Sequence, residues 1–213
     1  MPCPAEARLD AKKKTLTASE RDEEARAAFG AVIAALDSQD VVVVDEMGSS
    51  ISLTRLYARS PKGQRAYGSA PRNHGTNTTL IGALTPAGLP LAMTIDGAVD
   101  RAAFEVFCEH VLCPALRPGQ TILLDNLSVH KGQRVRELIE TAGCSLLFLP
   151  AYSPDFAPIE QAFAKVKGIL RTIGARTKEA LEQAIAVALD AISPQDAYGF
   201  FRHCGFRAPS LPT

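Results

Sequence analysis

The chain has 213 residues, 46% of them hydrophobic and 22% charged, which is enough material for one globular domain with a buried core. Its 23 Lys and Arg residues equal its 23 Asp and Glu residues in number, so the formal net charge is zero. The molecule as a whole therefore has no field that would attract nucleic acid or an anionic membrane, and any such attraction must be local.

The sequence carries no signal for export, membrane insertion or a nucleotide cofactor. The longest stretch without Asp, Glu, Lys or Arg, residues 73–95, is interrupted by Pro86 and Pro90. The N-terminus lacks the apolar core of a signal peptide. No G-x-x-x-x-G-K-[ST] or G-x-G-x-x-G motif occurs, and the five cysteines include no Cys-x-x-Cys pair. We expect a cytoplasmic protein without membrane contact, whose cysteines act as small apolar residues.

The first predicted elements are a helix and a buried strand. Residues 20–36 are acidic at the start and then rich in alanine, which predicts a helix that Thr17 or Ser19 could cap. Four consecutive valines, residues 41–44, predict a strand covered on both faces. This strand ends at the acidic pair 45–46.

A hairpin is the next predicted unit. Residues 78–84 and 89–95 are apolar runs separated by Thr-Pro-Ala-Gly, a sequence typical of a turn between antiparallel strands. A further strand is expected near residues 51–57.

The second half of the chain alternates helices and strands. Helical spacing over 101–116 precedes an apolar strand at 121–124, and a second helical pattern at 132–142 precedes a strand at 145–149. Strand, helix, strand implies a parallel pair. The predicted fold is α/β, with a mixed sheet that joins an antiparallel hairpin to parallel strands and is flanked by helices.

Three acidic side chains follow the ends of these elements. Asp45 and Asp125 each terminate an apolar strand, and ligand sites in open α/β sheets lie beyond such strand ends. Glu160 comes early in a helix predicted to run from Pro158 to about Ile173. Three converging carboxylates repel one another, which favours either one raised pKa or the binding of hard divalent cations, here Mg²⁺ or Mn²⁺. Two such ions about 3.5–4 Å apart can promote phosphodiester displacement.

Each of these acids, taken singly, could instead cap a turn or lie on a helix surface, but their joint placement favours a site. Glu46 and Asp155 are second choices for ligands. His130, five residues after Asp125, could orient a phosphate or a water, or could simply form a hydrogen bond within the loop. Tyr152 and Ser153 could line the site, but we expect them only to shape a turn.

Positive charge is concentrated in two segments that contain no acid. Residues 47–95 and 161–178 each follow an expected metal ligand, so phosphate could be held where the metals act. Ordinary solvated surface is the alternative. In the second segment, two cations share one flank of the predicted helix with Glu160. The candidate DNA-binding residues are Arg55, Arg59, Lys62, Arg65, Arg72, Lys167 and Arg171.

Three runs of residues together resemble a known family. Val-Val-Asp45-Glu46, Leu-Leu-Asp125-Asn126 with His130, and Leu-Pro-Ala-Tyr-Ser-Pro-Asp-Phe-Ala-Pro-Ile-Glu160 are similar to the catalytic domain of bacterial insertion-sequence transposases of the mariner superfamily, with 34 residues between the second and third acids. The resemblance implies a ribonuclease H-like fold in which Asp45, Asp125 and Glu160 hold two Mg²⁺ ions, which Mn²⁺ could replace. Glu46, Asn126 and His130 would support these ligands.

The resemblance also implies the reaction and the partners. The family cuts transposon ends and joins the freed 3′-hydroxyl to target DNA, and pairing of two ends implies a homodimer or larger assembly on the nucleoid. Residues 39–213 would form the catalytic domain with its C-terminal helices, and residues 1–38 an extension with one helix. Family members carry a helix-turn-helix region before the first aspartate, so we expect that region on a separate chain or lost. Ala157 replaces an asparagine often found in the family.

Two other functions remain open from the sequence. The same fold could carry out hydrolysis alone, as in a structure-selective nuclease. The chain could also be a truncated regulator that binds DNA without catalytic activity. Joining of a pre-cut transposon end to target DNA distinguishes the transposase from both.

Overall fold

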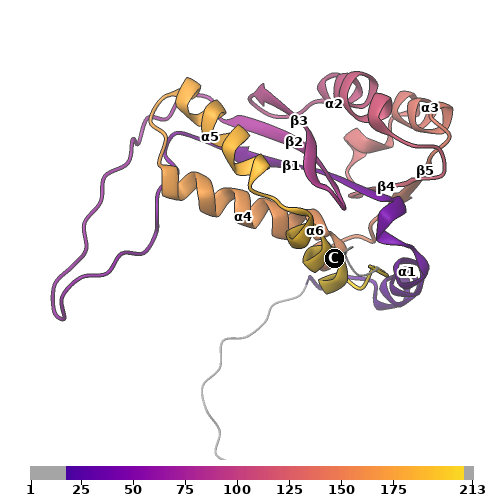
Figure 1. Ribbon diagram of the computed structural model, residues 1–213, viewed down its shortest axis with the longest axis horizontal. Helices are drawn as coiled ribbons and strands as arrows, with labels where there is room; N and C mark the ends of the chain where they lie inside the picture. The colour runs from indigo at the N-terminus through magenta and orange to yellow at the C-terminus, as the bar shows by residue number, and fades with distance from the viewer. Residues whose placement is uncertain (1–17, 209–213) are drawn as a thin grey trace, which may run out of the picture.

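The computed structural model describes residues 18–208, in which five strands form one mixed sheet (Figure 1). The order across the sheet is β3-β2-β1-β4-β5. The hairpin strands β2 and β3 and the strand β1 pair antiparallel, whereas β1, β4 and β5 pair parallel, which confirms the predicted mixed sheet. The strands are β1 (Val41–Ser49), β2 (Thr78–Thr85), β3 (Gly88–Asp96), β4 (Thr121–Leu124) and β5 (Ser145–Phe148).

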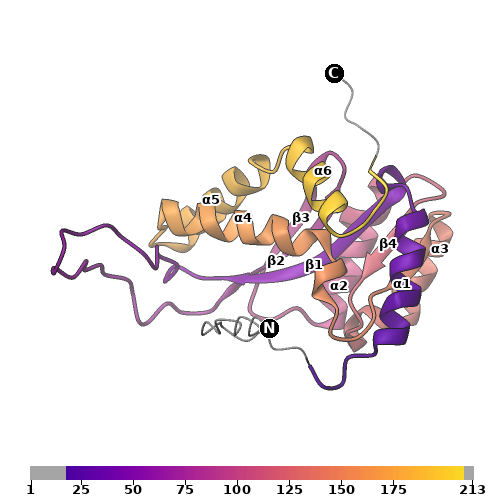
Figure 2. The ribbon, with the colours of Figure 1, turned by 90° about the horizontal axis from the view of Figure 1, so that it is seen from below.

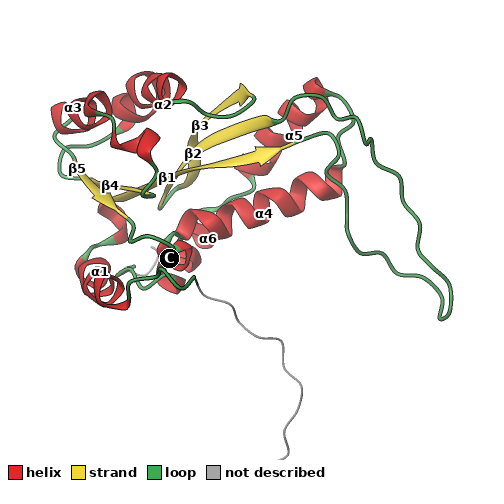
Figure 3. Ribbon diagram, turned by 180° about the vertical axis from the view of Figure 1, so that it is seen from behind, coloured by secondary structure: helices red, strands yellow, loops and turns green. Residues whose placement is uncertain are grey.

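Helices cover both faces of this sheet (Figure 3). Helices α2 and α3 pack on one face, and α4 packs on the other together with α1, α5 and α6. The helices are α1 (Glu23–Ala35), α2 (Arg101–Phe107), α3 (Gln133–Thr141), α4 (Pro158–Ile173), α5 (Lys178–Asp190) and α6 (Pro194–His203).

The valine run of β1 explains why the sheet has two covered faces. Val41 and Val43 belong to the core under α4, while Val42 and Val44 belong to the core under α2. Successive side chains of a strand point to opposite faces, so four buried valines require apolar cover on each side. Each of the four is at most 1% exposed, which confirms the prediction of a strand covered on both faces.

Two helices differ from their predicted ends. α1 begins at Glu23, and the cap is Asp22, whose Oδ1 accepts hydrogen bonds from the amides of Glu24 and Ala25, so Ser19 is not the cap. Thr17 lies outside the described residues. The helix predicted over 101–116 is regular only to Phe107, and a π turn and a 3₁₀ turn follow it. Pro114 lies in that final turn, where its lack of an amide hydrogen prevents regular helical bonding.

The prediction of a strand near residues 51–57 is wrong. Residues 50–77 form a long loop that extends away from the sheet (Figures 1 and 2). Ile51 and Leu53 still pack against the core, but Leu56 and Tyr57 are 74% and 90% exposed, so the apolar pattern does not continue into a buried strand. One side of β1 is already paired with β2 as far as Ser49, and residues 51–57 do not pair with the other side, which β4 leaves free beyond Val43.

The turn of the β2–β3 hairpin packs against the junction of α5 and α6. Gly88 has a φ of +116°, and a Cβ added there would lie 2.3 Å from the carbonyl oxygen of Ile192. Only glycine combines that backbone conformation with such a close approach. The hairpin predicted around this glycine is confirmed.

The structure also bears on membrane-spanning helices and on the cysteines. No helix within residues 18–208 has the length and apolar character needed to cross a bilayer. Cys108, Cys144 and Cys204 are buried free thiols and Cys113 is a half-buried one, in agreement with a role as small apolar residues. Cys3 lies outside the described residues.

Candidate active site

The sheet opens at the point where β1 continues beyond its pairing with β4. β1 pairs with β4 only over residues 41–43, whereas its pairing with β2 continues to Ser49. Asp45 lies just past this divergence, and Asp125 immediately follows the last residue of β4. The prediction that β1 ends at residues 45–46 is wrong, because pairing with β2 extends β1 to Ser49. Beyond the point where they separate, the parallel strands β1 and β4 border a gap, the kind of place where α/β sheets bind ligands.

The three predicted acids line one cavity at this opening. The cavity has a volume of about 480 Å³, and Asp45, Asp125 and Glu160 contribute to its wall. They come from β1, from the end of β4 and from the first turn of α4, and Glu160 is the most exposed of them. The other lining residues are Glu46, Asn126, Leu127, Leu149, Pro150, Ala151, Tyr152, Ser153, Pro154 and Ala157.

Asp45 is the acid with the most unfavourable charge environment. Its pKa is raised to about 7, and burial is the largest cause. The negative charges of Glu46, Glu160 and Asp125 act in the same direction, whereas the hydrogen bond from the Glu46 amide, 2.7 Å from Asp45 Oδ1, lowers the pKa. A carboxylate that resists ionisation for these reasons would be stabilised by a nearby cation.

His130 connects two of the acidic residues. Its Nδ1 lies 2.5 Å from Oδ1 of Asp125, its Nε2 lies 2.8 Å from Oε1 of Glu46, and its ring packs 4.3 Å from that of Phe104 on α2. Burial lowers the pKa of His130, but the two carboxylates outweigh burial and raise it to about 9. The protonated ring therefore donates to both carboxylates. Because the side chain is fully buried, it orients Asp125 and does not reach a phosphate.

Asp125 is held in place by two donors on the same oxygen. Its Oδ1 accepts from His130 and from the amide of Leu127, 3.0 Å away. Burial raises the pKa of Asp125, yet the hydrogen bonds from His130 and Leu127 bring it below its usual value. Asp125 is thus ionised at neutral pH, and Oδ2 is the oxygen left for a ligand.

The loop between β5 and α4 forms the opposite wall of the cavity. Ser153 is buried and its hydroxyl donates to the carbonyl of Ala151, so it shapes the turn as predicted. Tyr152 has a φ of 55°, an uncommon conformation for a residue other than glycine. Asp155, a second choice as a site acid, does not line the cavity and forms an ion pair with Arg26 of α1.

The candidate DNA-binding residues lie outside the cavity. Five of them belong to the long loop and are exposed, and the other two, Lys167 and Arg171, are half-buried on α4 beyond Glu160. Within residues 18–208, none of the seven forms an ion pair with an acid. By contrast, Lys165 and Lys178 are paired. The seven charges are therefore available to an external anion.

The cavity offers oxygen donors suited to a hard divalent cation. Asp45 Oδ2, Asp125 Oδ2 and the carboxylate of Glu160 accept no hydrogen bond from any residue that the structure describes. Free carboxylate oxygens are the ligands that Mg²⁺ and Mn²⁺ prefer. No three His, Cys, Asp or Glu side chains of the described part converge closely enough to constitute a complete metal site. The donor set fits such an ion, although its members line the cavity without meeting at one point.

Comparison with known families and structures gives matches of two kinds. The family model described as DDE superfamily endonuclease matches residues 40–182, a range that contains all three acids. A comparison with curated protein sequences gives no significant match.

The structural likeness is to Mos1 mariner transposase. The pre-cleavage Mos1 transpososome gives a TM-score of 0.76 at 20% identity over 92% of this chain and 64% of that chain. The Mos1 paired-end complex with Mn gives 0.71 at 18% identity over 94% and 65%. The isolated Mos1 catalytic domain gives 0.65 at 14% identity over 90% and 93%. The chain has the ribonuclease H-like fold of that domain and spans less than two thirds of the transposase chain in the transpososome.

Proposed function

This chain belongs to the DDE superfamily of endonucleases, and from that premise we propose that it is the catalytic part of a transposase. It cuts DNA at transposon ends and transfers the 3′-hydroxyl to target DNA. The observation that carries the proposal is the cavity in which Asp45, Asp125 and Glu160 present oxygens without hydrogen-bond partners among the described residues. The likeness to a Mos1 strand transfer complex, with a TM-score of 0.73 at 21% identity, supports it.

The three acids are proposed to hold two Mg²⁺ ions, with Mn²⁺ able to substitute. When bound, the ions would promote attack of a hydroxyl on a phosphodiester and stabilise the leaving oxygen. His130 keeps Asp125 ionised and oriented, and Glu46 completes the bridge on the other ring nitrogen. Asn126 is exposed and lines the cavity, and we propose that its side-chain amide donates to a phosphate oxygen.

DNA is proposed to approach along α4 and beneath the long loop. Lys167 and Arg171 follow Glu160 at intervals of seven and eleven residues, and therefore remain on nearly the same flank of the helix. The five cations of the long loop add a second set of phosphate contacts. Such contacts fix the position of the duplex without reading its sequence.

The origin and assembly of the protein are part of the same proposal. The motif around Glu160 supports a bacterial insertion sequence of the mariner superfamily, acting on the nucleoid in the cytoplasm. Two transposon ends require two active sites, so we propose a homodimer or larger assembly on DNA, as the paired-end complexes of Mos1 suggest. A separate chain with the helix-turn-helix region stays a prediction, as does the division at residues 38 and 39.

The test begins with the DNA on either side of the gene, and inverted repeats found there supply the transposon-end substrate. A pre-cut transposon end and a target plasmid are incubated with the protein and Mg²⁺, and joined product is sought by primer extension. Joined product that disappears with EDTA is the expected result. Cleavage without joining would favour the hydrolytic nuclease. DNA binding with neither Mn²⁺ binding nor nicking would favour the inactive regulator.

A further inference from the structure

The start of α4, which carries Glu160, has no cap of its own. Ala157 occupies the N-cap position, and its side chain cannot accept a hydrogen bond from the first turn. Ser, Thr, Asp or Asn at this position would satisfy one of the free amides and fix the direction in which the chain enters the helix. The position of Glu160 therefore depends on contacts made elsewhere.

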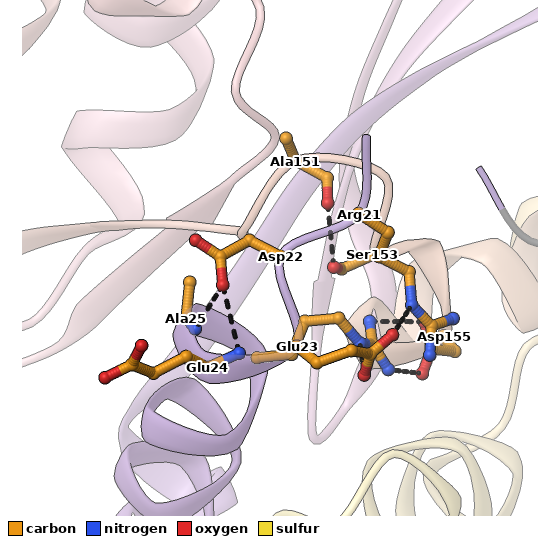
Figure 4. A network of polar contacts seen from close by, with 9 residues as sticks. Arg21, Asp22, Glu23, Glu24, Ala25, Ala151, Ser153 and Asp155 are labelled. Carbon is orange, nitrogen blue, oxygen red and sulfur yellow. Dashed lines mark hydrogen bonds and ion pairs between the residues drawn. The ribbon is translucent and has the colours of Figure 1, made fainter. Parts of the chain in front are cut away.

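Ile159 and Phe163 pack the apolar face of α4 on the sheet, and a second set of contacts comes from α1, across 129 residues of sequence. Arg26 Nη1 lies 3.0 Å from Asp155 Oδ1, and Nη2 lies 2.7 Å from Oδ2, which is a bidentate pair. Asp155 lies in the 3₁₀ turn (Pro154–Phe156) immediately before α4. Figure 4 shows Asp155 beside Arg21 and Glu23, at the start of α1. Two parallel hydrogen bonds restrain both the distance and the orientation of this turn.

Apolar packing reinforces the pair. The guanidinium carbon of Arg26 lies 4.5 Å from the centre of the Phe156 ring, and that ring also packs on Phe29 with centroids 5.3 Å apart. Arg26 is only 8% exposed, and its Nε has no hydrogen-bond partner within residues 18–208, since Glu23 Oε2 lies 3.6 Å away. Both of its terminal nitrogens bond Asp155, so the polar contacts of this buried guanidinium are directed at the turn before α4.

We propose that Arg26 and Asp155 are positioning residues that hold the entrance of α4, and with it Glu160, against the cavity in place of a helix cap. Helix α1 then stabilises one wall of the active site through this contact. Both side chains lie outside the cavity and do not contact the reacting atoms. The inference rests on the proposed function, because that function makes Glu160 a metal ligand.

Two substitutions isolate the pair, and a third provides a control. Asp155→Asn keeps the shape and removes the charge, while Arg26→Lys keeps the charge and removes the planar fork. Asp196→Asn breaks a comparable ion pair, 2.6 Å between Lys165 Nζ and Asp196 Oδ2, which joins the middle of α4 to α6. It lowers stability without touching the entrance of α4.

Hydrogen exchange, measured without added metal, tests the positioning directly. Amides of residues 151–163 should exchange at least about tenfold faster in Asp155→Asn and Arg26→Lys, and at the original rate in Asp196→Asn. Equal exchange in all four proteins would overturn the proposal. The same acceleration in the control would also overturn it, since the effect would then be general destabilisation.

Mn²⁺ titration, followed by electron paramagnetic resonance, tests the consequence for the site. We expect about tenfold weaker binding in the two variants, and cleavage that returns towards the original rate as Mn²⁺ is raised. Unchanged Mn²⁺ affinity would contradict a link to Glu160. If the unaltered chain binds no Mn²⁺, the proposed function fails, and the exchange experiment still decides whether the pair positions α4.

Discussion

The cavity and the long loop carry opposite charge and are built in opposite ways. The acids of the cavity come from a sheet strand, the end of another and a helix, and two of them share a buried histidine. The basic residues of the long loop are exposed, and the loop is tied down near its base, where Arg176 donates to the carbonyls of Ile51 and Leu53. Metal ligands must be placed to a fraction of an ångström, whereas attraction of a polyanion needs only charge of the right sign.

The largest effect should follow from removing one acid of the cavity. Asp45→Asn preserves shape but removes a charged ligand, so cleavage should fall by about a thousandfold or more, equivalent to about 4 kcal/mol. The melting temperature in EDTA should not fall, because repulsion among the acids decreases. Asp40→Asn, at an exposed acid outside the cavity, is the matched control. Cleavage within tenfold of the original would remove Asp45 from the site.

A smaller loss is expected when the buried bridge is broken. His130→Gln leaves Asp125 and Glu46 without a common donor, so cleavage should fall by about 10–100-fold. Stability in urea should decrease by about 1–3 kcal/mol, because buried acceptors lose their partners. Full activity combined with reduced stability would show that His130 serves the fold and not the orientation of Asp125.

Changes in the long loop should affect binding and leave the chemical step intact. With Arg59→Ala and Arg65→Ala combined, the slope of log K against log salt should become shallower by about 1.8, since each phosphate contact contributes about 0.9. Cleavage at saturating DNA should stay within about twofold, and the melting temperature should not change. Gln64→Ala is a neutral control from the same loop. An unaltered slope would place these two arginines away from DNA.

The smallest effect concerns the ion pair between Lys165 of α4 and Asp196 of α6, which lies outside both regions. Hydrogen bonds from Lys165 and Ser193 lower the pKa of Asp196 to about 2, below the value of about 3.9 in an unfolded chain. The resulting stabilisation is complete above about pH 5 and is lost as pH falls through 4 towards 2. We expect it to be about 1 kcal/mol, because the side chain is partly exposed. Urea unfolding between pH 2 and 6 should show a flatter profile for Asp196→Asn.

Local sequence patterns were sufficient to predict the sheet and the acids. Four consecutive valines can only be buried from two sides, which placed Asp45 on this strand although the strand end was predicted too early. Asp125 does follow the last residue of its strand. Pro158 similarly marked the first residue of α4, and hence the place of Glu160. These predictions depend on residues within a few positions of one another.

The sequence could not predict contacts between distant segments. Arg26 and Asp155 are 129 residues apart, and neither belongs to a pattern that indicates the other. The strand predicted at 51–57 had suitable residues, but this segment leaves the sheet after Ser49 and pairs with no strand that the structure describes. His130 was identified as a candidate, yet its role depended on Glu46, which is 84 residues earlier.

The two connections that follow β1 and β2 offer very different prospects for protein engineering. Since any side chain at Gly88 would collide with the backbone oxygen of Ile192, the short hairpin turn is closed to fluorescent labels, affinity tags and inserted sequence. Gly68, in the long loop, has nothing within 4 Å of an added Cβ and lacks the positive φ of Gly88, so it tolerates such additions far better. A change in the emission of a fluorophore placed there would test whether DNA approaches the long loop, and the contact between Gly88 and Ile192 would stay as it is.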